Sequence, residues 1–401
     1  MDLSRLIASS AVYKEARLLA KSKGKAKSFE PTHRYLTKRN NDFYKYLKDK
    51  SNLQTFCDSL ADYKISEYKG FALAKGADDK GRVKYRPLLI PGHSDRLLFS
   101  IVNKMLFPLF EEHMKKFNSL GIGLREDGKK ISAGPVIKEL IALNDAGYTH
   151  VLKTDFKRFF CTIPRSKLLH KMKPLLKRHH EGDLLYELIK QSLYNNIVAD
   201  DIFESEFSSW QLHLRGVPQG LSYSSLLASF YGTILDGAIS DVSGVKHSRY
   251  LDDMIILSNS KDNLDVAYTK LKQVSTKIGL YLHDIGPVNN GKTFEVDSKT
   301  DPYMFIGVEV KAGMARVPEM AIKRFKRVIE QEIINTDTIK RYSPEQIKEV
   351  FDNYTYGWKR AYSSVVSPDH FNDVIRLLND YLKKYLSTKR KRDLIGESFH
   401  L

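Results

Sequence analysis

Apolar and polar residues follow two different periodicities along this chain. Residues 151–160 and 248–257 contain short apolar or aromatic runs interrupted by acidic residues, which is typical of β-strands. Nearer the C-terminus, apolar residues recur at helical spacing from Ile322 to Ile333, with lysine and arginine between them. The pattern therefore predicts an α+β chain with strands in its middle and helices from about residue 317 onward.

The stretch 248–257 predicts two short strands joined by a tight acidic turn. Its last four residues are apolar and would anchor the second strand, while Asp252 and Asp253 lie at the tip. Because successive strand residues point to opposite faces, we expect Asp252 to be a principal metal ligand and Asp253 to be peripheral. An Asp-Asp pair alone more often marks a solvated turn, so this interpretation depends on the rest of the chain.

A third carboxylate, Asp155, ends the predicted strand 151–155 and lies 97 residues before Asp252. A local turn cannot explain both residues, whereas separate strands of one rigid sheet can bring them together. Carboxylates placed in this way can hold two hard divalent cations against phosphate groups. Between them, residues 215–220 predict a turn that leads into an apolar, small-residue helix over 221–239.

These motifs together resemble those of reverse transcriptases. Residues 250–253, Tyr-Leu-Asp-Asp, resemble the Tyr-x-Asp-Asp box, and residues 217–220, Val-Pro-Gln-Gly, are similar to the nucleotide-binding turn of that family. Residues 155–160 resemble its first palm carboxylate followed by an aromatic residue. Order and spacing agree from about residue 71 to at least residue 307. The motifs are most similar to bacterial group II intron, retron and phage-defence enzymes.

The resemblance implies an α+β right-hand polymerase with fingers, a palm built from an antiparallel sheet with helices, and a helical thumb. We expect a basic helical N-terminal extension over residues 1–70 and fingers over 71–150. The palm would occupy 151–312, with a helical outer part over 165–205, and the thumb 313–401.

The resemblance also assigns roles to individual residues. Asp155, Asp252 and Asp253 would be the catalytic and metal-binding triad, with Phe156 beside them at the metal and the nucleotide. Mg²⁺ is expected because the donors are oxygens, and Mn²⁺ could substitute for it. The other nucleotide-binding residues would be Lys75 and Arg86 at the triphosphate, Phe160 at the sugar, Gln219 in the turn, and Lys292.

Two of these assignments have an alternative that the sequence leaves open. Lys292 could be an ordinary surface-loop lysine, and either Phe159 or Phe160 could belong to the core instead of contacting the sugar.

Residues 304–308 resemble the family's primer-gripping strand, in which Gly307 would allow close approach of the nucleic acid. The basic residues of the first thumb helix would also bind nucleic acid: Lys323, Arg324, Lys326 and Arg327.

The net charge of the chain indicates the class of its binding partner. The 401 residues carry a net charge of +17, and a polyanion is the natural partner of such a chain. The two cysteines, Cys57 and Cys161, show no disulfide or zinc spacing, and no apolar run reaches the ~20 residues of a membrane span. We therefore expect a cytoplasmic protein with no membrane partner.

The function expected from these residues is RNA-directed DNA polymerisation from dNTPs on an RNA template and a DNA primer. The resemblance favours a lone bacterial enzyme with an associated non-coding RNA in antiviral defence. A template-independent or protein-primed DNA polymerase remains an alternative, as does a non-catalytic RNA-binding scaffold of the same shape. Protein partners and oligomeric state are not indicated by the sequence.

The distribution of charge predicts steeply salt-dependent binding of nucleic acid. Residues 1–50 carry a net charge of +8 and residues 321–392 carry +7. If about 6 phosphates are neutralised, affinity should fall about 10³-fold between about 50 and 200 mM salt, because counterions are released on binding. A fluorescence-anisotropy titration at several salt concentrations measures this slope, and a nearly flat titration would contradict the prediction.

Overall fold

The computed structural model describes most of the chain as two compact units. The first comprises residues 1–124, 156–238 and 270–282, and the second comprises 125–155, 239–269 and 283–401. Within these bounds the described residues are 2–22, 45–77, 81–115, 125–126, 129–130, 134–199, 201–210, 215–288, 292–311, 313–333 and 343–397.

The first unit contains a three-stranded sheet in the order β2-β1-β6. Strands β1 (Tyr68–Ala77) and β2 (Val83–Ile90) form an antiparallel hairpin, and β6 (Ile197–Ala199) runs parallel to β1. The register of the hairpin shifts between Ala74 and Gly76, so Lys75 lies at a bulge.

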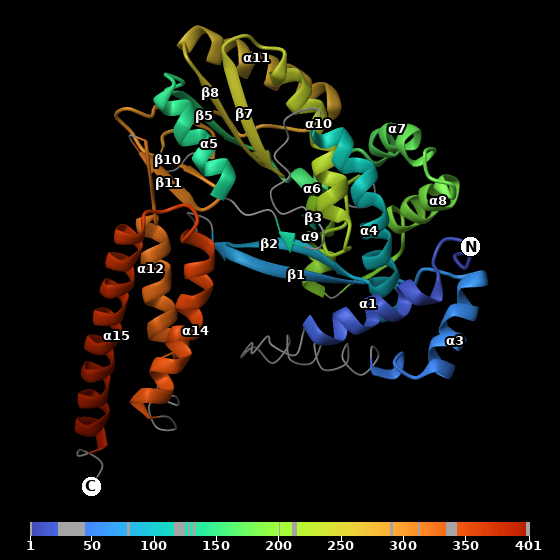
Figure 1. Ribbon diagram of the computed structural model, residues 1–401, viewed down its shortest axis with the longest axis horizontal. Helices are drawn as coiled ribbons and strands as arrows, with labels where there is room; N and C mark the ends of the chain where they lie inside the picture. The colour runs from blue at the N-terminus through green and yellow to red at the C-terminus, as the bar shows by residue number, and fades with distance from the viewer. Residues whose placement is uncertain are drawn as a thin grey trace. The chain divides into compact units, whose positions relative to one another are not determined.

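Helices make up the rest of the first unit (Figure 1). Helix α4 buries an apolar stripe, on which Phe99 meets the Tyr223 ring edge-on and Phe110 stacks on Phe230 with centroids 4.4 Å apart. The helices are α1 (Ser9–Ser22), α3 (Lys50–Asp58), the 3₁₀ turn η1 (Ser59–Asp62), α4 (His93–Lys115), α6 (Phe159–Thr162), α7 (Arg165–Leu176), α8 (Gly182–Leu193), α9 (Asp201–Trp210) and α10 (Ser224–Ser240).

The turn over residues 217–220 is docked on strand β2 of the same unit. The Leu89 amide donates a hydrogen bond to the Gln219 carbonyl at 2.7 Å. Gly220 has a φ of +130°, and a Cβ at this position would lie 2.0 Å from the Leu89 carbonyl oxygen. Only glycine fits this close approach, so the turn and the strand depend on each other.

The second unit contains a four-stranded antiparallel sheet in the order β7-β8-β5-β9. Its strands are β7 (Val245–Tyr250), β8 (Asp253–Ser258), β5 (His150–Asp155) and β9 (Phe294–Asp297). The four apolar residues of β8, residues 254–257, are completely buried, as the sequence predicts. Strand β5 is hydrogen-bonded on both sides, which places its C-terminal residue on a rigid support.

Two smaller sheets and several helices complete the second unit. Strands β10 (Tyr303–Phe305), β11 (Val308–Lys311) and β12 (Met314–Arg316) form an antiparallel meander, and β3 (Arg125–Glu126) pairs with β4 (Lys129–Lys130). The helices are α5 (Gly134–Asp145), α12 (Glu319–Val328), the π-helical turn η2 (Ile329–Ile333), α14 (Pro344–Tyr362) and α15 (Pro368–Glu397). Helix α11 (Lys261–Ile278) has residues in both units.

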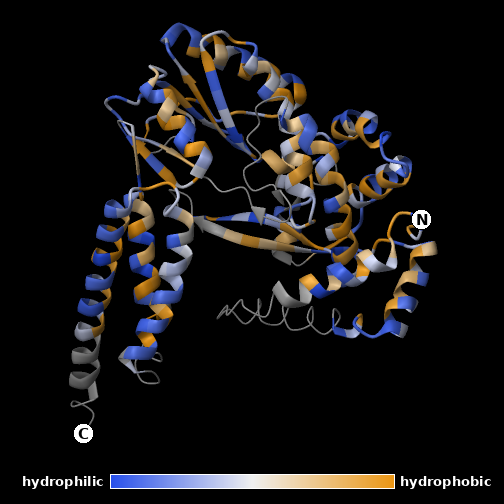
Figure 2. Cartoon of the chain, viewed as in Figure 1, coloured by the Kyte–Doolittle hydropathy of each residue, from blue (hydrophilic) through white to orange (hydrophobic). Residues whose placement is uncertain are grey.

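The three long C-terminal helices pack around their own core. Phe325 of α12 lies edge-on to the rings of Phe351 and Trp358 of α14, and Leu378 and Leu382 of α15 belong to the same buried cluster. Figure 2 shows hydrophilic and hydrophobic residues interleaved along α12, α14 and α15, as expected for amphipathic helices. Trp358 is partly buried and packs against this core.

The α+β class predicted from the sequence is confirmed, with two local corrections. Residues 165–205, expected to be helical, also contain strand β6, which pairs with β1. Residues 304–308, expected to form one strand, instead contain a turn between β10 and β11, where Ile306 and Gly307 have φ of +45° and +82°. Among the described helices, none is long and apolar enough to cross a membrane.

The docked turn yields a stability prediction. Gly220→Ala should destabilise the protein by at least about 2 kcal/mol, because the added methyl group collides with the Leu89 carbonyl. Urea unfolding measures the loss, and hydrogen exchange at the Leu89 amide should accelerate. Gly357→Ala is the control, since a Cβ there meets nothing within 4 Å and the position is helical. Equal stability of Gly220→Ala and wild type would contradict the prediction.

Candidate active site

The β7–β8 hairpin carries two of the three predicted carboxylates. Tyr250 pairs with Asp253 across the hairpin, leaving Leu251 and Asp252 as a two-residue turn. Leu251 has a φ of +58°, an uncommon conformation for a residue with a branched side chain. The buried Arg249 guanidinium donates a hydrogen bond from Nη1 to the Leu251 carbonyl at 3.0 Å, which stabilises this strained turn.

Pairing of β5 with β8 brings the third carboxylate to the same place. Asp155 lies directly opposite Asp253 in the antiparallel register. Asp252 directly precedes Asp253 and lies in the turn. Directly opposite residues share one face of a sheet, so the Asp155 and Asp253 side chains lie on the same face. The structure thus brings together three carboxylates that the sequence separates by 97 residues.

Two lysines partly neutralise this cluster. Lys153 precedes Asp155 by two residues, lies on the same face of β5, and forms an ion pair with Asp253. Lys292 forms an ion pair with Oδ2 of Asp155 at 2.9 Å. The other Asp155 oxygen, Oδ1, is buried and accepts no hydrogen bond from any described residue. A buried carboxylate oxygen without a donor is costly, so this atom is suited to bind a cation.

The electrostatics of Asp253 reflect this crowding. Burial raises the pKa of the Asp253 carboxyl, Lys153 opposes that rise, and the negative charges of Asp155 and Asp252 add to it. The net shift is upward, so the cluster holds its negative charge against a cost. A bound divalent cation would relieve that cost.

The carboxylate oxygens of the cluster are donors that suit magnesium. All the candidate ligands are carboxylate oxygens, which a hard cation prefers. Within the described residues, however, no three His, Cys, Asp or Glu side chains are assembled into a ready metal cage. Magnesium in phosphate-transfer sites commonly binds one or two carboxylates together with substrate phosphates, and the cluster is consistent with that mode.

The sequence leaves open whether Lys292 binds the nucleotide or is an ordinary surface-loop lysine, and the position of Lys292 bears on this choice. Its ammonium pairs with Asp155, and the hydroxyl of the next residue, Thr293, lies 3.1 Å from the Thr154 hydroxyl in the core. Lys292 is therefore an exposed loop lysine whose ammonium pairs with one of the carboxylates, and the structure leaves both interpretations open. Contact with a nucleotide stays a prediction.

The first unit gathers most of the predicted nucleotide-binding residues. The Val217 amide donates to the Phe160 carbonyl at 2.8 Å, which ties α6 to the turn that contains Gln219. The same turn contacts β2, on which Arg86 is exposed, and the backbone of Lys75 lies on the paired strand β1. These residues thus belong to one connected assembly of turn, hairpin and short helix.

The aromatic residues after Asp155 occupy different environments. Phe156 and Phe159 are each 2% exposed and belong to the core, whereas Phe160 is half-buried. The rings of Phe159 and Phe160 meet edge-on with centroids 6.0 Å apart. Of the two candidates for sugar contact, Phe160 is the one whose ring reaches the surface.

The predicted nucleic-acid contacts lie in the second unit. Gly307 is in the β10–β11 turn, where its positive φ requires glycine, and its carbonyl accepts a hydrogen bond from the Tyr362 hydroxyl at 3.1 Å. This bond connects the turn to the end of α14. On α12, Lys323 pairs with Glu319, Lys326 lies 4.8 Å from the Tyr381 ring centroid, and Arg324 and Arg327 are exposed.

Sequence reasoning missed two residues of the carboxylate cluster, Lys153 and Arg249. Lys153 had a readable signal, since a residue two positions before Asp155 in a strand must share its face. Arg249 had none, because burial of an arginine beside a strained turn depends on tertiary packing.

Comparison with known proteins agrees with this geometry. A family model described as reverse transcriptase (RNA-dependent DNA polymerase) matches residues 76–309. No curated protein sequence matches the chain.

Among solved structures, the chain is similar to telomerase from Candida albicans in complex with a TWJ fragment of telomeric RNA. The identity is 12% and the TM-score 0.47, over 80% of this chain and 59% of that one. It is also similar to apo telomerase from Candida tropicalis, at 11% identity and a TM-score of 0.45, over 80% of this chain and 63% of that one. The chain therefore spans less than two thirds of the length of these telomerases.

The family match covers more than half of the chain and includes all three carboxylates. It confirms the family resemblance that the sequence motifs indicate. The chain belongs to the reverse transcriptase (RNA-dependent DNA polymerase) family.

Proposed function

We propose that this chain copies RNA into DNA at the carboxylate cluster on β5 and the β7–β8 hairpin. The observation that carries the proposal is the pairing of Asp155 with Asp253 at the end of β5, with Asp252 in the adjoining turn. Three acidic side chains on a rigid sheet edge are costly unless a cation neutralises them, and polymerisation of nucleotides is chemistry that such cations support.

Asp155 and Asp252 would hold the divalent ions, Asp155 through its unpartnered Oδ1. Asp253 would contribute its negative charge to the metal site. Phe156 would also belong to this site, because it directly follows Asp155 in the chain. When bound, the ions would activate the primer hydroxyl and neutralise the triphosphate. Magnesium is the proposed metal, with manganese as a substitute, because every donor is a hard oxygen ligand.

The nucleotide would bind against the turn, the hairpin and the short helix of the first unit. The flexible ammonium of Lys75 and the forked guanidinium of Arg86 suit a triphosphate that must be held and then released. Gln219 can donate and accept hydrogen bonds at the sugar or base. Lys292 would add a positive charge beside Asp155.

The template and primer would be held in part by the second unit. The basic residues of α12 would contact phosphates, and the Gly307 turn would support the primer end. The Tyr362–Gly307 hydrogen bond supports the proposal that the turn and α12 bind the same nucleic acid, because it connects the turn to the helical bundle that contains α12.

The biological role is a finer proposal that rests on sequence resemblance and charge. We propose a bacterial enzyme with a dedicated non-coding RNA and a function in antiviral defence. The net charge of +17 supports an RNA partner. Sequencing the nucleic acid that co-purifies with the protein would identify the RNA, the template and the product, and its absence would contradict a dedicated partner.

The catalytic assignment predicts that Asp252→Asn loses activity but stays folded. Removing one negative charge from a two-ion site should lower primer extension by at least about 10³-fold. Extension of a DNA primer on an RNA template with Mg²⁺ measures the loss, and circular dichroism checks the fold. The exposed Asp262 of α11 supplies the control, Asp262→Asn, which should retain wild-type activity.

Near-wild-type extension by a folded Asp252→Asn protein would contradict the catalytic assignment. If wild type extends no primer on any template and shows no response to Mg²⁺, the protein is a binding scaffold. If it adds nucleotides without a template or primer, the alternative of a template-independent or protein-primed polymerase is correct.

The half-buried ring of Phe160 predicts selection against ribonucleotides. A rigid ring beside the sugar can exclude a 2′-hydroxyl by overlap, so Phe160→Ala should incorporate rNTPs at least about tenfold better than wild type. The control is Phe159→Ala, whose buried ring should cost about 3–5 kcal/mol of stability without changing sugar selection. A folded Phe160→Ala protein that rejects rNTPs as strongly as wild type would remove Phe160 from this role.

A further inference from the structure

The two lysines at the carboxylate cluster differ in how they are held. Lys153 lies on β5, which is hydrogen-bonded to β8 and β9, and its side chain is 12% exposed. Lys292 lies outside the strands, just before β9, and its side chain is 59% exposed. Lys292 can therefore leave Asp155 for solvent or for a phosphate, whereas the Lys153 backbone is fixed and its side chain is enclosed.

The charge of Lys153 is balanced by a carboxylate of the adjacent strand. A buried ammonium must be paired, and its partner here is Asp253, on the same face of the adjacent strand. Breaking the pair would leave two partly buried charges, with side chains 12% and 28% exposed, without their compensation. The Lys153–Asp253 pair is thus expected to persist while other charges at the cluster change.

We propose that Lys153 is the permanent counter-cation of this active site, whereas Lys292 is an exchangeable one. Lys153 keeps Asp253 occupied and sets the net charge with which the cluster binds divalent ions. The three carboxylates and the two lysines together carry one net negative charge in the metal-free protein. This inference rests on the proposed two-ion function and adds to it a residue that limits the strength of metal binding.

The proposal has two measurable consequences. Without Lys153 the cluster gains one negative charge, so Mg²⁺ should bind about tenfold tighter or more, since unit charges at close range interact strongly in a partly buried site. In the absence of metal the three carboxylates should then repel one another without relief, and the protein should melt at a lower temperature. Added Mg²⁺ should restore most of that loss.

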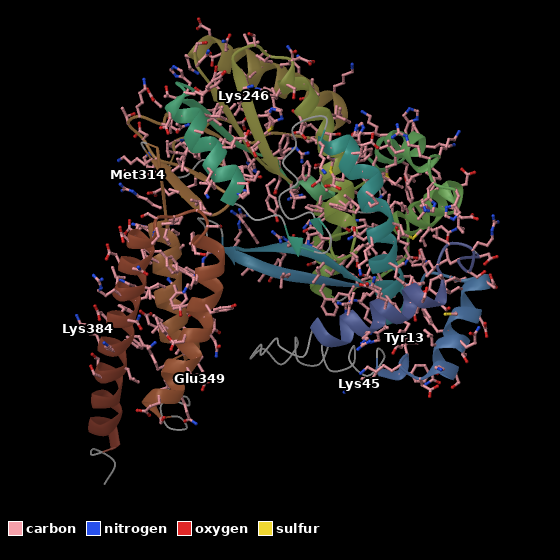
Figure 3. The ribbon with its side chains drawn as sticks, in the orientation of Figure 1. Tyr13, Lys45, Lys246, Met314, Glu349 and Lys384 are labelled. Carbon is pink, nitrogen blue, oxygen red and sulfur yellow. The ribbon has the colours of Figure 1, made fainter. Side chains whose placement is uncertain are left out.

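The experiment compares three methionine variants that keep the length of the lysine stem. Lys153→Met, Lys292→Met and Lys246→Met are melted in EDTA and in increasing MgCl₂, and Mg²⁺ affinity is measured by calorimetry. Lys246, labelled in Figure 3, is an exposed lysine of β7 opposite Leu257, and it serves as the control within the same sheet. We expect added MgCl₂ to raise the melting temperature of Lys153→Met much more than that of wild type. Lys246→Met should respond as wild type does.

Lys292→Met should tighten Mg²⁺ binding less than Lys153→Met does, because an exposed lysine is screened and can already move aside. Lys153→Arg retains the charge and should retain wild-type Mg²⁺ affinity, even if the larger head group lowers the melting temperature. A purely structural role of Lys153 predicts instead an equal loss of stability in EDTA and in Mg²⁺.

A second pair of variants tests the proposal should Lys153→Met not fold. Asp253→Asn and the double variant Asp253→Asn/Lys153→Met have the same carboxylates and differ only in the charge of Lys153. The double variant should bind Mg²⁺ about tenfold tighter than Asp253→Asn. Equal affinities would overturn the proposal.

The outcomes also separate this inference from the function on which it rests. Wild-type protein that binds Mg²⁺, together with a Lys153→Met protein that binds it no tighter, overturns the inference alone. Wild-type protein that shows no Mg²⁺ binding and no Mg²⁺-dependent melting overturns the metal site and the inference together.

Discussion

The antiparallel pairing of β5 with β8 is the interaction on which the candidate active site depends. Its register places Asp155 opposite Asp253, and a shift by one residue would turn one carboxylate to the other face of the sheet. Both faces of β8 are buried over residues 254–257, so such a shift would move side chains packed on one face to the other and disrupt the core. The same apolar residues that form the core therefore determine the geometry of the acidic cluster.

Charge balance imposes the second constraint. Carboxylates gathered at a sheet edge repel one another, and burial of Asp253 raises the cost of keeping them ionised. The chain lowers that cost with its own cations, one enclosed and one exposed. The proposed metal site would have to be stable both with and without its ions, and one enclosed and one exposed lysine would suit both states.

Besides Arg158, the described residues other than glycine with positive φ lie in the two turns that the proposed function uses. Leu251 beside Asp252 and Ile306 beside Gly307 both adopt positive φ, although neither is glycine. In each case a hydrogen bond from a distant or buried side chain supports the turn, from Arg249 in the first and from Tyr362 in the second. The conformations persist because the surrounding packing compensates for their cost.

The sequence by itself determined the strands that carry the three carboxylates and the helical character of the C-terminal region. Asp155 and the Asp252–Asp253 pair could be assigned because apolar runs of strand length flank them, and local patterns of this kind survive folding. The repeat through Phe325 and Ile329 likewise predicted a helix with a buried face, which α12 and the turn after it confirm.

Only the tertiary structure decided which side chains meet. The Asp155–Asp253 register, the Lys153 and Lys292 ion pairs and the docking of Gln219 on Leu89 join residues far apart in the chain. The burial of Phe159 rather than Phe160 depends on neighbouring elements, not on either residue's type. Local periodicity reports which face of an element is apolar, but the partner of that face is chosen by packing over the whole unit, and no short stretch of sequence contains that information.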